Sequence, residues 1–262
     1  MTPSAAAVEV AVVTGASTGI GREFARRLAK RCGKVILIAR DAARLEETRQ
    51  EVVALGAAAE IIVCNLSERS EVERLAQQLS EIPNIEYLVN NAGFGTMGDF
   101  VDVDRQQHAD MINVHVVATV LLTHAVVAGM KARGRGYIIN VASMSSFMIG
   151  PGQVTYAATK ASLTSFSESL QVELERTGVQ VQALCPGFTR TDFHNRPQFE
   201  GFDRDTISAN LWLTPEKVVD FSLKKLPSKR VVCVPGLKNQ FFARLMTFRF
   251  VRIIAGKSVR KK

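Results

Sequence analysis

Short runs of apolar, mostly β-branched residues alternate along this 262-residue chain with longer segments of helical periodicity. The apolar runs predict seven strands: Val8–Thr14, Lys34–Ala39, Glu60–Cys64, Ile85–Val89, Tyr137–Val141, Val179–Leu184 and Val231–Val234. The intervening segments predict helices at about residues 20–31, 41–55, 67–80, 104–132 and 155–176. Nearly continuous apolar strands separated by helices are typical of a parallel sheet covered on both faces. The pattern therefore predicts an α/β fold in one domain, residues 1–262, built on a doubly wound parallel sheet of about seven strands.

Two segments depart from this alternation. Residues 190–213 contain Pro197, Gly201 and several aromatic residues, and we expect them to form a lid over a ligand beyond the strand ends. Residues 237–262 form a basic C-terminal segment. No acidic residue follows Asp220, whereas 12 Lys and Arg residues do, so the whole net charge of +8 comes from the last 42 residues.

The stretch Gln240–Ala255 within this tail has apolar residues at near-helical spacing and basic residues around them. Such a helix suits weak peripheral docking on an anionic membrane surface. The alternative is that the helix covers the substrate cleft or packs in a subunit interface. Both interpretations stay open at this stage.

The composition is that of a soluble protein, with 47% hydrophobic and 22% charged residues. No apolar run reaches the roughly 18 residues of a membrane span, and the N-terminus lacks a secretory pattern. The four cysteines lie far apart without metal-ligand spacing, which favours buried reduced thiols, no metal and a cytoplasmic location. No nucleic-acid recognition motif is present, so a nucleic-acid partner is not expected.

A glycine-rich turn follows the first predicted strand. It reads Thr14-Gly15-Ala16-Ser17-Thr18-Gly19-Ile20-Gly21, directly before the first predicted helix. Glycines allow a tight turn and close approach of the backbone to a pyrophosphate, and a helix N-terminus favours anions. Glycines can also serve packing alone. The position between strand and helix predicts a Rossmann-type dinucleotide site at Gly15, Ser17, Thr18, Gly19, Ile20 and Gly21.

The end of the second strand indicates which nucleotide is bound. An NAD enzyme usually has a carboxylate there, whereas this chain has Ala39 followed by Arg40 and Asp41. A guanidinium suits the 2′-phosphate of NADP(H), with which it can pair bidentately. The alternative is that Arg40 lies on a surface loop and pairs with Asp41 or Glu47. We expect NADP(H).

Three residues have the chemistry of a proton-transfer site. Tyr156 and Lys160 are four residues apart on a predicted helix and so share a face, and Ser143 follows the strand before it. An ammonium beside a tyrosine favours the phenolate and lowers the pKa of the phenol. Ser143 can orient a substrate oxygen by donating a hydrogen bond. By itself, Tyr-x-x-x-Lys is often only a surface pair.

Together these motifs resemble the short-chain dehydrogenase/reductase family over about residues 8–192. The match comprises the glycine turn, Asn90-Asn91-Ala92-Gly93, the Ser143, Tyr156 and Lys160 set, and Pro186-Gly187 with Thr189 and Thr191. The resemblance implies that Tyr156 and Lys160 also contact the cofactor. It further implies cofactor contacts at Asn65, Leu66, Asn91, Ala92, Gly93, Pro186, Gly187, Thr189 and Thr191. The family more often has Asp where Asn65 stands.

One position departs from the family pattern. The resemblance implies an asparagine in the long helix, eight residues before Thr123, where it holds a water in a proton relay. This chain has His115 there, and Asn113 lies two residues earlier. Imidazole can both donate and accept hydrogen bonds, so His115 is a candidate catalytic residue. The alternatives are a helix bulge that restores Asn113 to the site, or a histidine that is buried for structural reasons.

These observations lead to a functional expectation. The chain is similar to NADP-preferring reductases of 3-oxoacyl and steroid-type ketones, and we expect hydride transfer between nicotinamide and a fairly apolar ketone or secondary alcohol. Aromatic and sulfur-containing residues expected near the cleft are Phe147, Met148, Phe188, Phe193, Phe199 and Trp212. The alternative is a catalytically impaired NADP(H)-binding regulatory or scaffold protein. The resemblance also implies a homodimer or homotetramer formed through the helices at 104–132 and 155–176.

Overall fold

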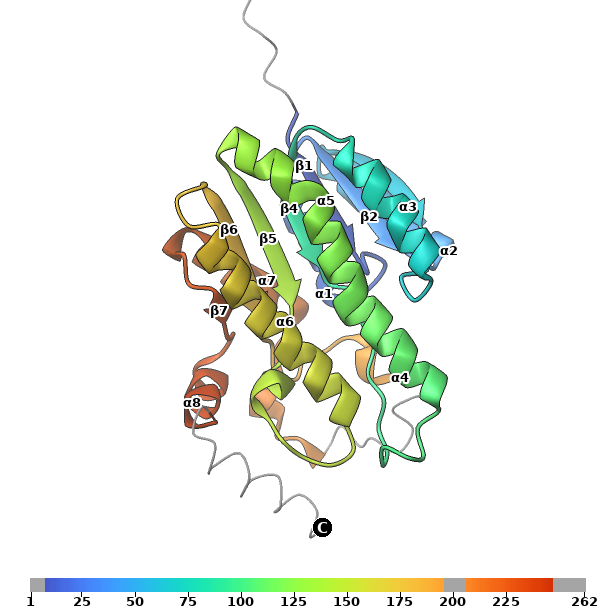
Figure 1. Ribbon diagram of the computed structural model, residues 1–262, viewed down its shortest axis with the longest axis vertical. Helices are drawn as coiled ribbons and strands as arrows, with labels where there is room; N and C mark the ends of the chain where they lie inside the picture. Colours follow the sequence, from blue (N-terminus) through green and yellow to red (C-terminus); the bar gives the residue numbers. More distant parts are fainter. Residues whose placement is uncertain (1–7, 196–205, 247–262) are drawn as a thin grey trace, which may run out of the picture.

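The computed structural model describes residues 8–195 and 206–246. Its centre is a seven-stranded parallel sheet with strand order β3-β2-β1-β4-β5-β6-β7 (Figure 1). The strands are β1 (Val10–Thr14), β2 (Lys34–Ala39), β3 (Ala58–Val63), β4 (Ile85–Asn90), β5 (Gly136–Val141), β6 (Val179–Leu184) and β7 (Val232–Cys233). The chain builds outward from β1 to β3 and then crosses to β4 on the other side of β1. This reversal creates a crevice at the carboxyl ends of β1 and β4, where doubly wound sheets bind ligands.

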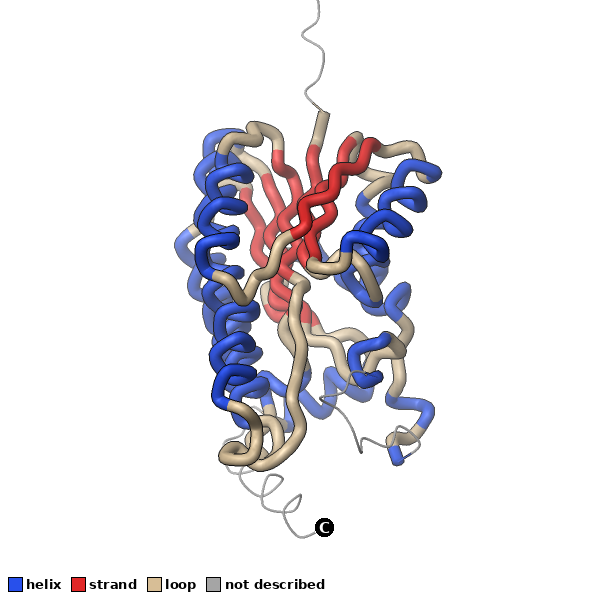
Figure 2. Tube along the Cα trace, turned by 90° about the vertical axis from the view of Figure 1, so that its right-hand side faces the viewer, coloured by secondary structure: helices blue, strands red, loops and turns tan. Residues whose placement is uncertain are grey.

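Helices cover both faces of the sheet, as the sequence pattern predicts (Figure 2). One layer contains α1 (Gly19–Leu28), α2 (Ala42–Ala54) and α7 (Pro215–Lys225); the other contains α3 (Arg69–Ser80), α5 (Ala118–Arg133) and α6 (Val154–Glu173). Successive strand residues point to opposite faces. In β1, for example, Val13 packs in the first layer and Val12 in the second. Strand β1 is therefore buried on both sides.

The long helix predicted at 104–132 is one continuous helical run, Arg105–Arg133. It consists of α4 (Arg105–Ile112), a π-helical turn η1 (Asn113–Val117) and α5. By length and composition this run could cross a membrane, but helices buried in soluble cores have the same pattern. Leu122, Val126 and Met130 of α5 pack in the core against the sheet.

The C-terminal part contains two helices that differ from the sequence predictions. The sequence analysis did not predict α7, although Thr214 caps it by accepting a hydrogen bond from the Lys217 N–H and Pro215 occupies its first turn. The last described helix is α8 (Leu237–Leu245), which begins three residues before the expected Gln240. Residues 247–255 of that expected helix, and 196–205 of the expected lid, lie outside the described residues.

Candidate active site

Six strand ends surround one cavity of about 1350 Å³. Its lining includes the segments that directly follow β1, β2, β3, β4, β5 and β6. The cavity brings together the predicted residues Gly15, Ser17, Thr18, Gly19, Ile20, Arg40, Asn65, Leu66, Asn91, Ala92, Gly93, Ser143, Tyr156, Lys160, Pro186, Gly187, Thr189 and Thr191. Of the predicted site residues, only Gly21 and His115 are not among those that line it. Both lie directly behind the cavity wall.

The glycine turn is held by the segment that follows β4. Asn91 Nδ2 donates to the Thr14 carbonyl at 2.9 Å, and Thr14 Oγ1 accepts from the N–H of Asn91 and of Ala92. Gly15 has φ +64°, and a Cβ there would lie 2.9 Å from the Ala92 Cα. A Cβ at Gly21 would lie only 2.2 Å from the Gly15 carbonyl oxygen, so Gly21 is needed for packing between the turn and α1. Asn91 thus positions the turn.

The N-terminus of α1 faces the cavity without an anionic group of its own. The side chain of the N-cap residue Thr18 makes no capping hydrogen bond in the described structure, and the first turn of α1 contains no acidic residue. The first N–H groups of a helix therefore point toward the cavity wall formed by Thr18, Gly19 and Ile20. This arrangement fits the pyrophosphate of a dinucleotide.

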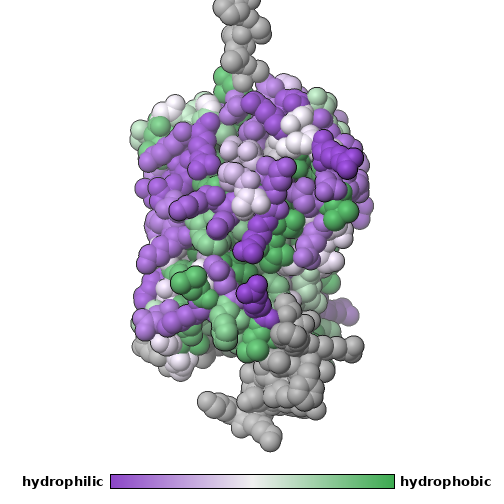
Figure 3. All heavy atoms as spheres, turned by 90° about the vertical axis from the view of Figure 1, so that its left-hand side faces the viewer, coloured by the Kyte–Doolittle hydropathy of each residue, from purple (hydrophilic) through white to green (hydrophobic). Residues whose placement is uncertain are grey.

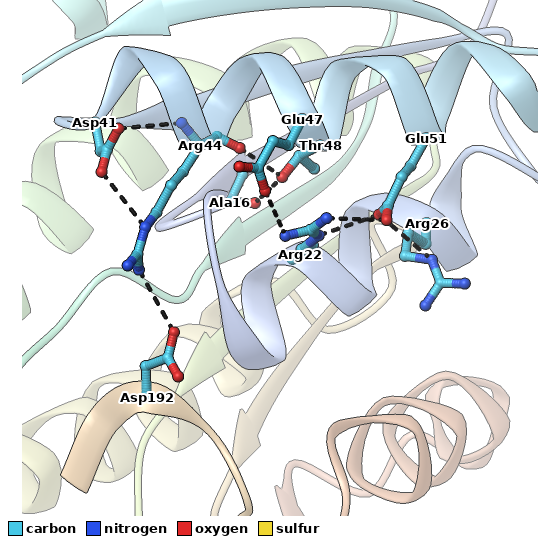
Figure 4. A network of polar contacts seen from close by, with 9 residues as sticks. All are labelled: Ala16, Arg22, Arg26, Asp41, Arg44, Glu47, Thr48, Glu51 and Asp192. Carbon is cyan, nitrogen blue, oxygen red and sulfur yellow. Dashed lines mark hydrogen bonds and ion pairs between the residues drawn. The ribbon is translucent and has the colours of Figure 1, made fainter. Parts of the chain in front are cut away.

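Three charged residues, Arg40, Asp41 and Arg44, line one end of the cavity. We call it the adenosine end, because the sequence analysis expects the adenosine of the cofactor there. Arg40 is exposed and takes part in none of the ion pairs found between described residues. Asp41 instead lies near Arg44, and Glu47 pairs with Arg22 at 3.2 Å (Figure 4). The sequence alternative, in which Arg40 pairs with Asp41 or Glu47, is therefore wrong for the described structure.

The loop after β3 forms the neighbouring wall. The side-chain oxygen of Asn65 accepts hydrogen bonds from the N–H and the hydroxyl of Ser67, and Leu66 is buried. Asn113 Nδ2 donates to the Ser67 carbonyl at 3.1 Å. Asn113 therefore supports this loop.

The predicted catalytic side chains come from β5 and α6. Ser143 follows β5 and caps the short helix η2 (Met144–Phe147), where its Oγ accepts from the Ser145 N–H. Tyr156 and Lys160 lie one turn apart at the start of α6. Lys160 Nζ donates to the Val141 carbonyl at 2.8 Å and lies 5.7 Å from the centre of the Tyr156 ring. The three residues thus meet at the end of β5.

Burial is the main cause of the pKa shifts of Tyr156 and Lys160. It raises the pKa of Tyr156 to about 12, against an opposing interaction with the Ser143 hydroxyl, and it lowers the pKa of Lys160 to about 7. The expectation that the ammonium lowers the pKa of the phenol is therefore wrong for this structure, because desolvation dominates for both groups. Tyr156 is a neutral phenol at pH 7, the form that can donate a proton.

His115 lies in the π-helical turn and is buried against the catalytic group. Its Nε2 accepts the Phe94 N–H at 3.2 Å, and its Nδ1 lies 2.8 Å from Thr159 Oγ1, which donates to the Tyr156 carbonyl. These partners require the neutral tautomer with the proton on Nδ1. Burial and, secondly, the charge of Lys160 hold the pKa of His115 well below its ordinary value.

The helix bulge considered in the sequence analysis exists, but it does not bring Asn113 into the site. The π-helical turn covers Asn113–Val117, and within it His115 contacts the edge of the Tyr156 ring at 5.8 Å between centres. A Cβ on Gly93 would lie 2.7 Å from His115 Nε2 and 3.5 Å from Lys160 Nζ. His115 therefore lies against Tyr156 and is separated from the cavity by Gly93.

The other end of the cavity is apolar. It is lined by Phe94, Met97, Met148, Ile149, Phe188, Phe193, Leu211, Leu237, Phe241, Phe242 and Met246. Of the expected cleft residues, Phe147 packs in the core instead, and Trp212 lies behind Phe188 with ring centres 5.4 Å apart. Phe199 lies outside the described residues.

Sequence reasoning missed one part of this site and left a second part open between two interpretations. Thr159 links His115 to Tyr156, although nothing in its sequence context distinguishes it from other helical threonines. The start of α8 packs against the Pro186-Gly187 loop, since a Cβ on Gly187 would lie 2.7 Å from Asn239 Nδ2. The apolar periodicity of the tail was the available signal for this contact.

Comparisons with known proteins agree with this geometry. The sequence profile of the short chain dehydrogenase family matches residues 9–199. A Streptomyces violaceoruber protein, named as a candidate ketoacyl reductase of the granaticin polyketide synthase, is 33% identical over 88% of this chain and 84% of its own.

Two solved structures are similar over most of the chain. A short-chain dehydrogenase from Sphingobium yanoikuyae in complex with NADPH has a TM-score of 0.81 and 31% identity, covering 87% of this chain and 88% of that one. The bulky-bulky ketone specific alcohol dehydrogenase from Comamonas testosteroni has a TM-score of 0.76 and 29% identity, covering 87% and 86%. The fold, the site and these matches together place the chain in the short-chain dehydrogenase/reductase family of nicotinamide-dependent oxidoreductases.

Proposed function

We propose that this enzyme reduces an apolar ketone with NADPH. The observation that carries the proposal is that Ser143, Tyr156 and Lys160 face the same cavity as the glycine turn and Arg40. One end of that cavity is cationic and the other apolar. A dinucleotide bound along the strand ends would place its reactive ring between the two.

The chain's own residues supply the acid–base chemistry. Nicotinamide would provide the hydride that adds to the carbonyl carbon. Ser143 donates a hydrogen bond to the carbonyl oxygen, and the Tyr156 hydroxyl transfers its proton to that oxygen as the alcohol forms. Lys160, with a pKa of about 7, is a source for reprotonating Tyr156 and would also hold the cofactor ribose. His115 and Thr159 fix the backbone of Tyr156.

Two observations support NADPH over NADH. Arg40 lines the adenosine end, and no described carboxylate pairs with it. The similar Sphingobium yanoikuyae enzyme is described in complex with NADPH. An exposed guanidinium without a carboxylate partner is suited to a phosphate dianion.

The substrate end supports a bulky, apolar ketone. Its lining is aliphatic and aromatic, with side chains from the loop after β5, from the segment after β6 and from α8. The relatives named above include a protein named as a candidate ketoacyl reductase and an enzyme specific for bulky-bulky ketones. A 3-oxoacyl or steroid-like ketone has the matching size and polarity.

A substrate and cofactor screen tests this function. Oxidation of NADPH and of NADH would be followed with 3-oxoacyl thioesters, steroid ketones, sugars and short ketones. We expect turnover with NADPH and an apolar ketone. Binding of NADPH without turnover on any ketone would favour the alternative of a regulatory NADP(H)-binding protein, which the complete set of Ser143, Tyr156 and Lys160 argues against.

We also propose that the enzyme forms a homodimer or homotetramer through α4, α5 and α6. These helices expose Ile112, Val120, Val154 and Val172, the last with 75% of its surface accessible. Apolar side chains on neighbouring helices are suited to burial in a subunit interface. Analytical ultracentrifugation of the wild type and of Val172→Lys tests this, because a charge there should weaken the assembly.

A cytoplasmic location with weak docking on anionic membranes is the last part of the proposal. The four cysteines are buried and free, as expected of a protein in a reducing compartment. Helix α8 exposes Leu237, Phe241 and Leu245, and no acidic residue follows Asp220. Figure 3 shows the left-hand side of Figure 1, where α8 lies in the lower part, and hydrophobic residues are interspersed with hydrophilic ones on the lower half of this face.

Phe242 and Met246 on the same helix line the cavity, which supports the alternative that α8 covers the cleft. Co-sedimentation with phosphatidylserine vesicles separates the two interpretations. We expect the wild type to sediment at low salt. Leu245→Ser, at an exposed residue that is not among those lining the cavity, should sediment less and keep normal activity. An unbound wild type would assign α8 to the cleft alone.

A further inference from the structure

Arg44 connects two segments that lie 148 residues apart in the sequence. It is on the first turn of α2, and its Nε lies 3.6 Å from Asp41 Oδ2. Its Nη1 lies 3.4 Å from Asp192 Oδ2, in the short helix η3 (Asp192–Asn195) across the cavity (Figure 4). One guanidinium thus lies between two carboxylates at the adenosine end of the site.

The segment on the far side also contacts other parts of the site. Thr191, the neighbour of Asp192, packs on the glycine turn, where a Cβ on Gly19 would lie 2.9 Å from Thr191 Cγ2. Phe193, the other neighbour, lies 6.0 Å from Tyr156 between ring centres. Asp192 therefore belongs to a segment that contacts both the glycine turn and Tyr156.

Arg44 is held more loosely than the other arginines around α2. Arg49 makes two hydrogen bonds to Glu46 at 2.6 and 2.7 Å, and Arg22 makes two to Glu51 at 2.9 and 3.1 Å. Arg44 instead has one long contact to each carboxylate, and its side chain is 51% exposed. Exposed ion pairs of this kind contribute little stability, so another anion can displace them.

Arg44 lines the same cavity as Arg40, which directly follows β2. A phosphate monoester carries up to two charges and three acceptor oxygens, and is a stronger partner for a guanidinium than a single distant carboxylate oxygen. Asp41 is already shared with Arg44, which reduces its repulsion of an incoming anion. These features give the adenosine end two guanidinium groups on one wall.

We infer that Arg44 is a second ligand of the cofactor 2′-phosphate, and that Asp192 holds this guanidinium until the phosphate displaces it. This inference rests on the proposed preference for NADP(H). It assigns to α2 a specificity-determining residue beyond Arg40. It also makes Asp192 a competitor of the cofactor at that residue.

Calorimetric titration of the full-length protein with 2′,5′-ADP and with 5′-AMP tests the inference, because the two probes differ only in the 2′-phosphate. The variants are Arg44→Gln and Asp192→Asn, with Arg49→Gln as the matched control. Arg49 is on the same helix as Arg44, and each pairs with a carboxylate three residues earlier. We expect Arg44→Gln to weaken 2′,5′-ADP binding about tenfold and to leave 5′-AMP unchanged. Arg49→Gln should bind both probes as the wild type does.

Asp192→Asn should strengthen 2′,5′-ADP binding about threefold, since the competing carboxylate is gone. Unchanged binding of 2′,5′-ADP to Arg44→Gln would overturn the assignment of Arg44. Unchanged or weaker binding to Asp192→Asn would overturn its role as a competitor. A wild type that binds the two probes equally would instead reject the NADP(H) preference of the proposed function.

Discussion

The two ends of the active-site cavity control charge in opposite ways. At the catalytic end, Lys160 and His115 are buried and Tyr156 is half-buried, and burial rather than ion pairing is the main cause of each shifted pKa. At the opposite end, Arg40 and Arg44 are exposed, and the Asp41 and Asp192 carboxylates that contact Arg44 are exposed as well.

This difference determines what a substitution should change. Groups inside a low-dielectric environment interact strongly, so losing one should affect turnover and stability. Exposed charges interact through water and salt, so losing one should affect cofactor choice by a moderate factor. The following predictions test this division, from the largest expected effect to the smallest.

Tyr156→Phe should have the largest effect. It removes the proton donor but keeps the ring that packs against His115 and Phe193. We expect kcat to fall about a thousandfold, within the range for loss of a general acid, with NADPH affinity unchanged. Steady-state kinetics and cofactor fluorescence titration measure the two quantities.

Tyr137→Phe is the matched control, since Tyr137 stacks on Tyr87 and is not among the residues that line the cavity. It should keep wild-type turnover. Substantial turnover in Tyr156→Phe would mean that another group donates the proton.

His115→Leu should have the next largest effect, because it leaves the Phe94 N–H and the Thr159 hydroxyl without their partner. We expect kcat to fall about thirtyfold, whereas His115→Asn, which can still donate and accept, should keep most activity. The pH–rate profile of His115→Asn should retain an ionisation near pH 7, which we assign to Lys160 with its pKa of about 7. Full activity in His115→Leu would show that the buried histidine is only structural.

Arg40→Gln addresses the exposed end of the cavity. The ratio of kcat/KM for NADPH to that for NADH should fall about tenfold, with kcat at saturating NADPH unchanged. The wild-type preference should also weaken as salt is raised, whereas the defect of Tyr156→Phe should not depend on salt. Equal wild-type kinetics with NADPH and NADH would contradict the proposal that the charge of Arg40 selects NADPH.

Particular residues show how far the sequence could predict this arrangement. The strands predicted at Lys34–Ala39 and Val179–Leu184 coincide with β2 and β6, because continuous apolar runs between helices have one stable location, the centre of a covered sheet. The missed helix α7 carried its own signal in Thr214-Pro215, a cap followed by a first-turn proline.

For the site, too, the sequence predicted some features and not others. Family spacing predicted that Ser143, Tyr156 and Lys160 meet, and they do so because Ser143 follows β5 and the other two lie at the start of α6. Two features remained hidden: the direction of the Tyr156 pKa shift depends on burial, and the Arg44 to Asp192 contact joins residues 148 positions apart. Both depend on tertiary packing, which local pattern does not encode.

The smallest predicted effect concerns stability in acid. The pKa of His115 is well below its ordinary value of 6.5 in the folded state, so below about pH 6.5 the unfolded chain binds a proton that the folded chain does not. The folded state therefore loses stability as pH falls through 6.5, by up to about 1.4 kcal/mol per pH unit. Above pH 6.5 this residue contributes no slope. In His115→Asn the loss disappears, so the free energy of unfolding should fall by about 1 kcal/mol less than in the wild type between pH 7.5 and 5.5.

Urea denaturation at both pH values measures this difference, and His124→Asn is the control because His124 is exposed on α5, in the same continuous helix. The control should keep the acid-induced loss of the wild type. If His115→Asn and His124→Asn had the same pH dependence as the wild type, His115 would be solvated enough to titrate normally. Burial would then not control the charge of His115, and the proposed difference between the catalytic end and the exposed adenosine end would be wrong for this residue.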